Sequence, residues 1–340
     1  MTHSFENLRN KGEFRIVYLG GSITEGAGAS DRARRWATQI TAYLNSLGID
    51  GTAFCEINAG IGGTNSAYGM MRLSRDVLSQ KPQAVFIDFS LNDADMSEEL
   101  SAQMYEGIIR RLMAEPCAPY VVCIGVVPNR ETEFKTELHK KIAAHYGLQY
   151  IDVKAAMDAA YGKAAPGVNT ARDALFRPDN THPVEAGYDF YTEAIKKELS
   201  GESFRKPEGE AVSDYCKKCG KFINARDFER TGAWICQGFG DWSAPNPGRS
   251  GESLASCDST AALTLEFEGT ALLLGARFDR RAGKAELTLD GESRVCDLRY
   301  ETDDQPVIIF ESFTLPAGGH RLCVRPAEGE IKVDFAVIPE

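Results

Sequence analysis

The sequence has no apolar run that approaches the roughly 20 residues needed to span a membrane, so we expect no membrane partner. Its first residues, MTHSFENLRNKGEF, lack the apolar core of a secretory signal, which favours a cytoplasmic protein. Positive charge is not in excess either: 38 Lys and Arg stand against 49 Asp and Glu, a net charge of -11. This balance gives no electrostatic basis for binding nucleic acid.

A disulfide framework is missing as well, because the nine cysteines are odd in number and scattered along the chain. In a cytoplasmic protein this predicts free thiols. Cys216 and Cys219 form a C-x-x-C pair, but a structural zinc ion needs four ligands and no second pair follows. Cys236 and Cys257 could complete the set, although their spacing fits no familiar pattern. Free thiols are therefore favoured over zinc.

What is present, between residue 14 and about residue 153, is an alternation of short apolar runs and longer amphipathic segments. The apolar runs are rich in Val, Ile, Phe and Tyr, as buried parallel strands are, and cover residues 14–19, 52–57, 84–89, 120–127 and 148–153. The amphipathic segments predict helices over residues 33–47, 67–79, 98–114, 133–147 and 183–199. We therefore predict an α/β domain over residues 1–203, with a parallel sheet covered by helices on both faces.

The pattern changes after residue 200. Residues 200–214, SGESFRKPEGEAVSD, are polar, contain Gly and Pro, and predict a linker. Beyond them come short strand-like runs with little helical character, and Asp290-Gly291 is a pair typical of a hairpin turn. We predict an all-β domain over residues 212–340, a small sandwich of the jelly-roll type.

Four polar or glycine-rich segments lie at the ends of predicted strands or just before the last helix. They are GGSIT (20–24), NAGIGGTNS (58–66), SLNDAD (90–95) and PDNTHP (178–183). In an open parallel sheet, ligands bind outside the carboxyl ends of the strands. The four segments should therefore meet at one edge of the sheet, which makes this edge the candidate active site.

These segments contain what acyl transfer requires: a nucleophile, a base, a group that orients the base, and donors for an oxyanion. Ser22 could be the nucleophile, and Asp179, three residues before His182, could hold the imidazole in one tautomer. His182 is the one histidine in a loop at this edge. The other four are terminal, on a helix expected to be solvated, or in the β-rich half: His3, His139, His145 and His320.

The backbone N–H groups of Ser22 and Gly63 and the side-chain amide of Asn92 could complete an oxyanion hole. Asp93 is predicted to order the loop beside Asn92, and Asp88 is given no role. Motifs of other enzyme classes do not match. GGSITEGAG lacks the G-x-G-x-x-G spacing of a dinucleotide site, and the chain has neither the Gly-Lys-Ser/Thr ending of a phosphate loop nor the G-x-S-x-G motif of other hydrolases.

A simpler explanation exists for each segment taken alone. Gly20-Gly21 could be a plain turn, Asn92 a turn residue at a strand end, Asp179 a turn cap, and His182 a surface histidine. The occurrence of all of them together, in order and at one sheet edge, favours catalysis.

In order and composition, the four segments resemble blocks I, II, III and V of the SGNH, or GDSL-type, hydrolases, in the branch with GGSIT in place of G-D-S-L. The resemblance covers roughly residues 14–200. It implies a three-layer, flavodoxin-like fold, with Ser22 as the nucleophile and Asp179 and His182 as the acid and base. It also implies Gly63 and Asn92 as oxyanion donors beside the Ser22 N–H.

The glycine-rich block is the loosest match, since Gly60 and Gly62 are alternatives to Gly63. Gly63 is chosen because the donor glycine of the family usually precedes a Thr- or Asp-type residue, here Thr64.

The resemblance implies a carboxylic ester hydrolase that works through an acyl-enzyme, with no metal or organic cofactor. An SGNH domain joined to a jelly-roll module resembles bacterial carbohydrate O-acetylesterases, which implies a small acetylated xylo- or manno-oligosaccharide as substrate. Trp234 and Trp242 could stack on a sugar ring, although packing is favoured for at least one of them.

Other interpretations of the same residues stay open. On the same scaffold, they are a short-chain esterase, a lysophospholipase or a thioesterase. In another class, the chain could be a carbohydrate-binding protein without catalysis. A homo-oligomer in which the β-rich domain covers a neighbour's active site is also open.

Overall fold

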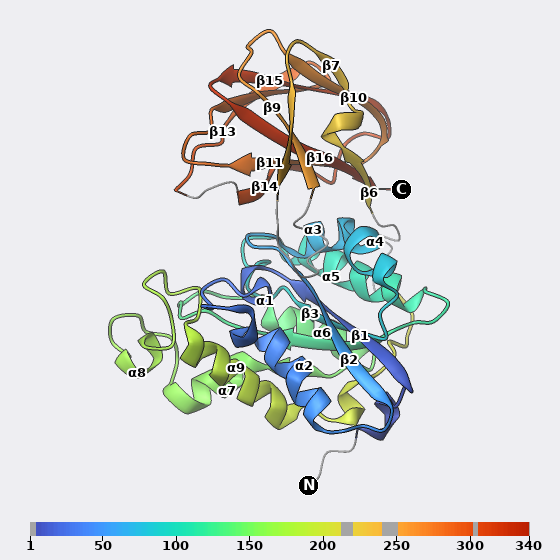
Figure 1. Cartoon of the computed structure of the whole chain (residues 1–340), viewed down its shortest axis with the longest axis vertical. Coiled ribbons are helices and arrows are strands. Elements are labelled where there is room, and N and C mark those ends of the chain that lie inside the picture. The colour runs from blue at the N-terminus through green and yellow to red at the C-terminus, as the bar shows by residue number, and fades with distance from the viewer. Residues whose placement is uncertain (1–4, 212–219, 240–250, 302–304, 340) are drawn as a thin grey trace. The chain divides into compact units, whose positions relative to one another are not determined.

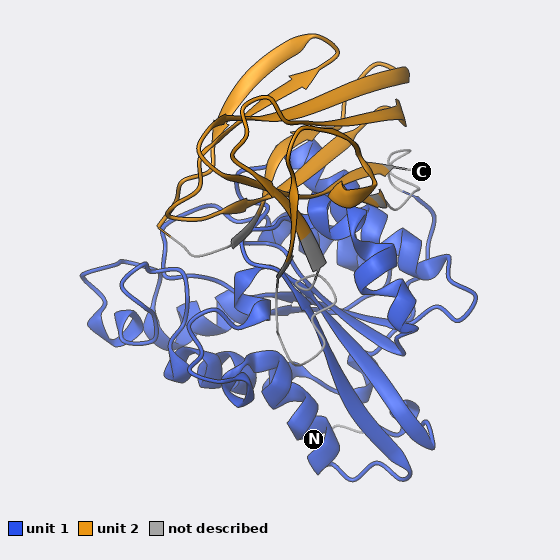
Figure 2. Ribbon diagram, turned by 45° about the horizontal axis from the view of Figure 1, so that its top comes forward, with its two compact units in different colours: residues 1–217, 245–248 blue, residues 218–244, 249–340 orange. Residues whose placement is uncertain are grey.

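The computed structural model describes residues 5–211, 220–239, 251–301 and 305–339 (Figure 1). The chain forms two compact units, Met1–Lys217 with Pro245–Gly248, and Lys218–Ala244 with Arg249–Glu340 (Figure 2). Unit 1 is α/β and unit 2 is built from antiparallel strands, as the change of pattern in the sequence predicts.

A five-stranded parallel sheet forms the centre of unit 1, with the strand order β2-β1-β3-β4-β5. The strands are β1 (Gly12–Gly20), β2 (Thr52–Gly60), β3 (Ala84–Asp88), β4 (Tyr120–Gly125) and β5 (Tyr150–Asp152). This order reverses between β1 and β3, and ligands of flavodoxin-like folds bind at such a reversal. The predicted flavodoxin-like α/β fold is confirmed.

Helices cover the sheet on both faces (Figure 1). The α-helices are α1 (Ser22–Glu25), α2 (Trp36–Ser46), α3 (Ser66–Met71), α4 (Leu73–Asp76), α5 (Glu98–Met113), α6 (Thr136–His145), α7 (Val153–Tyr161), α8 (Thr170–Asp173) and α9 (Glu185–Glu198). Single 3-10 turns are η1 (Glu6–Leu8), η2 (Arg32–Arg34), η3 (Leu78–Gln80), η4 (Gly201–Ser203) and η5 (Ala225–Asp227). Helices α2, α7 and α9 pack together, and α3, α5 and α6 form a second group.

Several helix starts are fixed by side chains that cap the backbone. The Asn65 side chain accepts the N–H of Tyr68 at the start of α3, and Ser97 does the same for Leu100 at the start of α5. The predicted helix over residues 67–79 is divided, because Arg72 leaves the helical conformation between α3 and α4. The short helices α1, α7 and α8 lie in stretches for which no helix was predicted.

The predicted linker is attached to unit 1 over most of its length. The Val121 N–H donates to the carbonyl of Arg205 over 2.8 Å, which extends the pairing of β4. Phe204 is buried with its ring edge against Phe86, and the N–H of Glu208 donates to the carbonyl of Tyr146. The described part of this segment therefore packs against the α/β unit.

Unit 2 consists of two antiparallel sheets, with strand orders β13-β12-β15-β10-β7 and β14-β11-β16-β9-β8, and β6 pairs with β16. The strands are β6 (Gly220–Asn224), β7 (Glu229–Thr231), β8 (Ile235–Phe239), β9 (Gly251–Ser256), β10 (Ala262–Gly269), β11 (Leu272–Phe278), β12 (Lys284–Leu289), β13 (Glu292–Asp297), β14 (Gln305–Ser312), β15 (Gly318–Glu328) and β16 (Ile331–Pro339). The all-β prediction is confirmed, while the jelly-roll type stays a prediction.

Alternating apolar residues of unit 2 form its core, including Leu263, Leu274, Leu322 and Val333. Asp290 has a φ of +51° in the turn between β12 and β13, the conformation expected of the predicted hairpin pair. In the described ranges of both units, none of the helices is long and apolar enough to cross a membrane.

Candidate active site

Ser22 follows the end of β1 after a single residue, Gly21, and is the first residue of α1. Its backbone N–H therefore has no acceptor within the helix. Neither of the two glycines before it has a positive φ, so the backbone conformation does not require glycine there. Close packing does. A Cβ on Gly20 would lie 2.8 Å from the carbonyl oxygen of Asp88, and one on Gly21 would lie 2.1 Å from Asn92 Oδ1. The pair is thus more than a plain turn, because it lets β3 and Asn92 approach the serine.

The structure brings Ser22, His182 and Asp179 into one hydrogen-bonded row. The distance from Ser22 Oγ to His182 Nε2 is 2.9 Å, and the distance from His182 Nδ1 to Asp179 Oδ2 is 2.8 Å. The carboxylate accepts a hydrogen bond from Nδ1–H, which keeps the proton on Nδ1 and leaves the lone pair of Nε2 free to accept the serine hydroxyl proton. This row can deprotonate the serine and stabilise the charge that forms on the imidazole.

Asp179 also holds the backbone of its own loop. Its Oδ1 accepts the N–H groups of Thr181 (2.8 Å) and His182 (2.9 Å), and Asn180 adopts a φ of +54° in this turn. Burial alone would raise the pKa of Asp179, but the hydrogen bonds from the His182 side chain and from these two N–H groups lower the pKa to about 2. The carboxylate is therefore ionised at neutral pH.

The loop of Asp179 and His182 is anchored to the end of β4 by residues that the sequence did not reveal. The N–H of Asn129 donates to the carbonyl of Asn180, and its side-chain amide donates to Asp173 Oδ1 over 2.6 Å. Arg130 donates to the carbonyl of Asp179 over 3.2 Å.

Helix α1 is tied to the neighbouring elements. Tyr188, on α9, donates its hydroxyl to the carbonyls of Ile23 and Ala27. Glu25 Oε2 accepts the N–H of Gly62 from the loop after β2, over 2.8 Å. The segment that begins with Ser22 is thus held by α9, which follows the loop of His182, and by the glycine-rich loop.

The glycine-rich loop lies against the turn of Ser22, because the N–H of Ile61 donates to the carbonyl of Gly20 over 3.0 Å. The N–H groups of Gly60 and Gly62 are both engaged, with Asn58 Oδ1 and Glu25 Oε2. Gly63 is exposed and has a φ of +73°, which suits glycine. It therefore stays the candidate donor among the three glycines.

A buried arginine, which the sequence did not reveal, supports the strand ends beneath this site. The guanidinium of Arg72 is fully buried and donates to the carbonyls of Ala59 (2.6 Å) and Gly20 (3.1 Å). It also pairs with the buried carboxylate of Asp76 at 3.0 Å. Arg72 thus fixes the end of β1, from which Ser22 projects, to the end of β2.

Asp88, to which no role was given, is a buried carboxyl beneath α1. Its Oδ2 accepts the hydroxyl of Thr24 over 2.9 Å, and Val126 N–H points at Oδ1 from 3.4 Å. Burial raises the pKa of Asp88 to about 7 against the lowering effect of these hydrogen bonds. The group therefore changes its charge near neutral pH.

One prediction about the histidines is wrong. His139 was expected on a solvated helix, but it is fully buried, because it stacks on Tyr105 with ring centroids 3.8 Å apart and its Nε2 lies 3.2 Å from Ser101 Oγ. His145, on the same helix, is exposed as expected. His320 is buried in unit 2, where it pairs with Asp290 at 2.6 Å.

The remaining predicted residues lie in or near unit 2. Trp234 packs partly against the core of that unit, and its indole N–H donates to the carbonyl of Thr231 over 3.1 Å, which favours anchoring. Trp242, Cys216 and Cys219 lie outside the described residues. Within the described ranges, no group of three or more His, Cys, Asp or Glu side chains is arranged to hold a metal ion.

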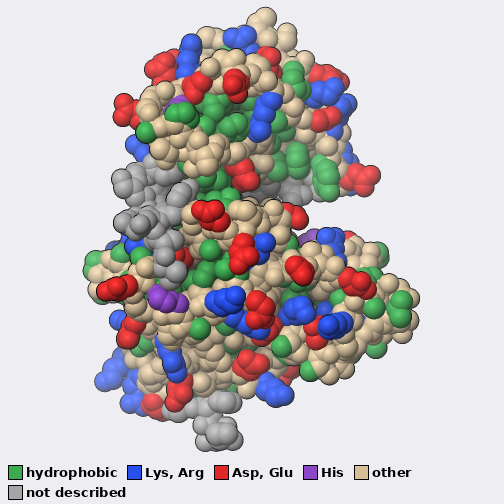
Figure 3. Space-filling model, turned by 180° about the vertical axis from the view of Figure 1, so that it is seen from behind, with side chains coloured by type: hydrophobic (Ala, Val, Ile, Leu, Met, Phe, Trp, Pro, Cys, Tyr) green, Lys and Arg blue, Asp and Glu red, His purple; other side chains and the backbone are tan. Residues whose placement is uncertain are grey.

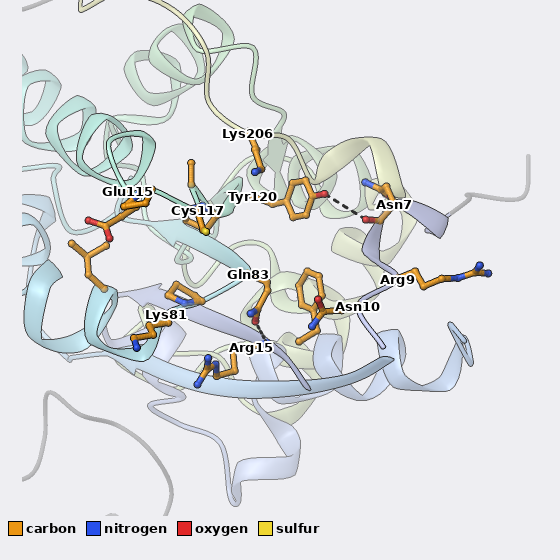
Figure 4. A pocket seen from close by; sticks show the side chains of 16 residues that line it. Asn7, Arg9, Asn10, Arg15, Lys81, Gln83, Glu115, Cys117, Tyr120 and Lys206 are labelled. Atoms are coloured by element: carbon orange, nitrogen blue, oxygen red, sulfur yellow. Dashed lines mark hydrogen bonds between the residues drawn. The ribbon is translucent and has the colours of Figure 1, made fainter. Parts of the chain in front are cut away.

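A pocket of about 660 Å³ lies at the opposite edge of the sheet, where β1, β3 and β4 begin. Lys81 and Lys206 lie on different sides of it, whereas Arg9 points away from the other side chains and pairs with Glu6 (Figure 4). On the face of the molecule that Figure 3 shows, acidic and basic side chains are interspersed. The pocket lies at the amino ends of the strands, so it is not the site of Ser22.

Comparison with known proteins gives matches to both parts of the chain. Residues 18–190, just over half of the chain, match the model of the GDSL-like Lipase/Acylhydrolase family. A curated relative, the uncharacterised lipoprotein YqeF of Bacillus subtilis (strain 168), is 36% identical over 89 residues, which are 25% of this chain. The chain therefore covers 34%, about a third, of the length of this relative.

Two solved structures resemble the whole chain. A two-domain esterase (CEX) active on acetylated mannans, co-crystallised with mannopentaose, matches with a TM-score of 0.76 at 22% identity, over 98% of this chain and 93% of that one. A second crystal structure of a two-domain esterase (CEX) active on acetylated mannans matches with a TM-score of 0.74 at 23% identity, over 97% of this chain and 92% of that one. At this identity the likeness establishes the fold of both units.

Proposed function

This chain belongs to the GDSL-like lipase/acylhydrolase family and is a carboxylic ester hydrolase, and we propose that it cleaves esters through an acyl-enzyme formed on Ser22. The observation that carries the proposal is the hydrogen-bonded row from Ser22 Oγ through His182 to Asp179, with distances of 2.9 and 2.8 Å. Such a row is the recurring arrangement of serine hydrolases.

In the first step, His182 Nε2 takes the proton of the Ser22 hydroxyl as Oγ attacks the ester carbonyl. The imidazolium that forms is stabilised by the ionised carboxylate of Asp179. His182 then gives its proton to the departing alcohol, and the acyl group stays on Ser22. Water, deprotonated by His182, attacks the acyl-enzyme, and the bond between the acyl carbon and Ser22 Oγ breaks as His182 returns the proton to Oγ and the acid leaves.

The negative charge on the former carbonyl oxygen requires donors that are in place before the reaction. We assign this role to the N–H groups of Ser22 and Gly63 and to the amide of Asn92. The support for Asn92 is its contact with the turn of Ser22, and that for Gly63 is the engagement of the other two glycine N–H groups in its loop.

As substrate we propose a small oligosaccharide that carries O-acetyl groups. The support is the match of both units, over 98% of the chain, to an esterase that is active on acetylated mannans. Acetylated manno-oligosaccharides are therefore the first choice and xylo-oligosaccharides the second. Fold alone does not choose between sugars, so the choice is made by experiment.

The test is acetate release from a panel of acetylated manno- and xylo-oligosaccharides by wild type and by Ser22→Ala. We expect release by the wild type and a fall of about 10⁶-fold in kcat for the variant. Acetate release by Ser22→Ala at the wild-type rate would sink the mechanism. A wild type that binds the sugars but hydrolyses no ester would be a carbohydrate-binding protein.

A second panel of one alcohol esterified with acyl chains of increasing length separates the proposal from a lysophospholipase or thioesterase. An acetylesterase loses activity as the chain grows, because its acyl site is short. Activity that rises with chain length would instead assign the protein to long-chain substrates.

We also propose the cytoplasm as the compartment. The seven cysteines in the described ranges are free thiols, which suits a reducing environment. Fractionation of cells that express the natural gene tests this, and acetylesterase activity in the medium or the cell envelope would contradict it.

A further inference from the structure

A buried polar cluster lies behind the loop of Asn92 and is centred on the carboxylate of Asp93. Asp93 Oδ1 accepts the backbone N–H of Ser66 over 2.8 Å, and Oδ2 accepts the Ser66 hydroxyl over 2.6 Å. The Ser101 hydroxyl donates to Oδ2 over 2.8 Å, and His139 Nε2 lies 3.2 Å from the same oxygen. The side chains of all four residues are fully buried.

The positions of the protons follow from the partners. Both serine hydroxyls give their hydrogen to the carboxylate, so Ser101 Oγ can only accept from the imidazole. His139 Nε2 faces two acceptors, Asp93 Oδ2 and Ser101 Oγ, and therefore carries the hydrogen in the neutral ring. Burial lowers the pKa of His139, which agrees with a neutral imidazole. Four donors thus surround one buried carboxylate.

The chain order gives this cluster its significance. Asp93 directly follows Asn92, and Ser66 lies three residues after Gly63 at the start of α3. The two bonds between Asp93 and Ser66 therefore join the loop after β3 to the loop after β2. Ser101, on α5, and His139, on α6, hold the carboxylate from the other side.

We propose that Asp93 is a positioning residue, which sets the distance between the oxyanion donors Asn92 and Gly63 by joining their two loops. This inference rests on the proposed function, because it assumes that Asn92 and Gly63 act as donors. Catalytic donors have to be held within about 0.5 Å of the productive geometry, and charge-assisted bonds away from water are strong enough to do so. Asn92 and Gly63 lie on separate loops, and the bonds between Asp93 and Ser66 join these loops directly.

The chain offers a matched pair of variants for the test, Ser66→Ala and Ser101→Ala. Both remove a fully buried hydroxyl that donates to the same oxygen of Asp93. Only Ser66 directly follows a donor-bearing loop, at the start of α3, so the two variants differ in the link they break. Both should lower the melting temperature by a similar amount, whereas only Ser66→Ala should weaken the coupling of the donor loops.

Acetate release and hydrogen exchange are measured on both variants in the full-length protein. For Ser66→Ala we expect kcat to fall about 10-fold with KM changed less than about 2-fold, because the missing geometry matters in the transition state. Amide exchange should rise in residues 61–66 and 90–95. For Ser101→Ala, kcat should stay within about 2-fold of wild type and exchange in residues 61–66 should be unchanged.

Equal losses of kcat in the two variants, or exchange in residues 61–66 that does not respond to Ser66→Ala, would overturn the inference. The exchange measurement does not depend on the substrate. A wild type without esterase activity would therefore contradict the proposed function, while loop exchange would still decide whether Asp93 couples the two loops.

Discussion

The two sides of the candidate active site are built in different ways. On the nucleophile side, Ser22 projects from closely packed strand ends and glycines, and the fully buried side chains of Arg72 and Asp93 bond the elements that carry the site. On the base side, Asp179 and His182 lie on a loop with side chains that are 42% and 26% exposed. One side depends on distant segments meeting, and the other depends on a turn of four residues.

This difference indicates where each side is sensitive to change. The geometry of Asp179 and His182 relative to each other is set within one turn, by a side chain that caps its own loop, and Asn129 and Arg130 hold that turn in place. The oxyanion side depends on loops after β1, β2 and β3, so that a distant substitution can move it. Substitutions on the two sides should therefore fail for different reasons.

The largest effect is expected from His182→Gln, which removes the base itself. We predict a fall in kcat of at least about 10⁴-fold, because every proton transfer of the proposed mechanism passes through His182. His145→Gln is the control, since His145 is exposed and its ring nitrogen bonds a carbonyl oxygen, that of Glu210, away from the row. Steady-state acetate release measures both, and comparable losses would contradict the assignment of the base.

Gly21→Ala should break the nucleophile side with the smallest possible side chain. The added Cβ would lie 2.1 Å from Asn92 Oδ1, so the amide has to move away from the oxyanion position. We expect kcat to fall about 10²- to 10³-fold, the usual effect of losing one oxyanion donor. Gly319→Ala, where a Cβ meets nothing within 4 Å, is the matched control and should leave kcat unchanged.

Asp179→Asn tests whether the base side is as local as the structure indicates. The amide cannot stabilise the imidazolium, and we expect kcat to fall about 10²-fold, less than for a fully buried triad acid because water can reach the exposed pair. The pKa of Asp179 is lowered to about 2, so its carboxylate stabilises the fold above about pH 4 and loses this effect as the pH falls toward 2. Thermal unfolding of wild type and variant over this range should show the difference.

The smallest effect concerns the buried carboxyl of Asp88 on the nucleophile side. Its pKa is raised to about 7, so the folded state keeps a proton that the unfolded state has already lost. The free energy of unfolding should therefore fall as the pH rises from about 4 to 7, and should level off above that. Asp88→Asn lacks this contribution. Calorimetry at pH 5.5 and at pH 8 gives the fall in melting temperature between the two pH values, and this fall should be about 5 °C smaller in the variant than in wild type. Equal falls would contradict the raised pKa.

How much of the site the sequence reveals follows the same division. Asp179 and His182 are close in the sequence, so their spacing alone predicts the pair. Ser22 is recognised because it follows a strand, and the alternation of strands and helices predicts where that strand ends. The sheet edge, the all-β second unit and the helix starts near Ser97 and Glu185 follow from the same local patterns.

The supports of the site could not be predicted in this way. Arg72 and His139 lie on segments with a helical pattern, and polar residues in such segments are usually solvated. Whether they are instead buried depends on carbonyl and carboxylate groups that the fold brings to them, such as Gly20 and Asp93. The break between α3 and α4 has the same origin, since it occurs at the buried Arg72.

The close approach of Gly20, Gly21 and Gly60 to backbone and side chains around Ser22 has a consequence for protein engineering and for sequence surveys. A Cβ at Gly60 would lie 2.3 Å from the backbone nitrogen of Glu25, and backbone atoms cannot turn away as a flexible side chain can. A saturation library at Gly20 and Gly60, where a Cβ would meet backbone atoms, should return glycine in every active clone. Natural chains that carry another residue at either of these two positions, even with the serine and histidine intact, are then the ones to examine for binding without turnover.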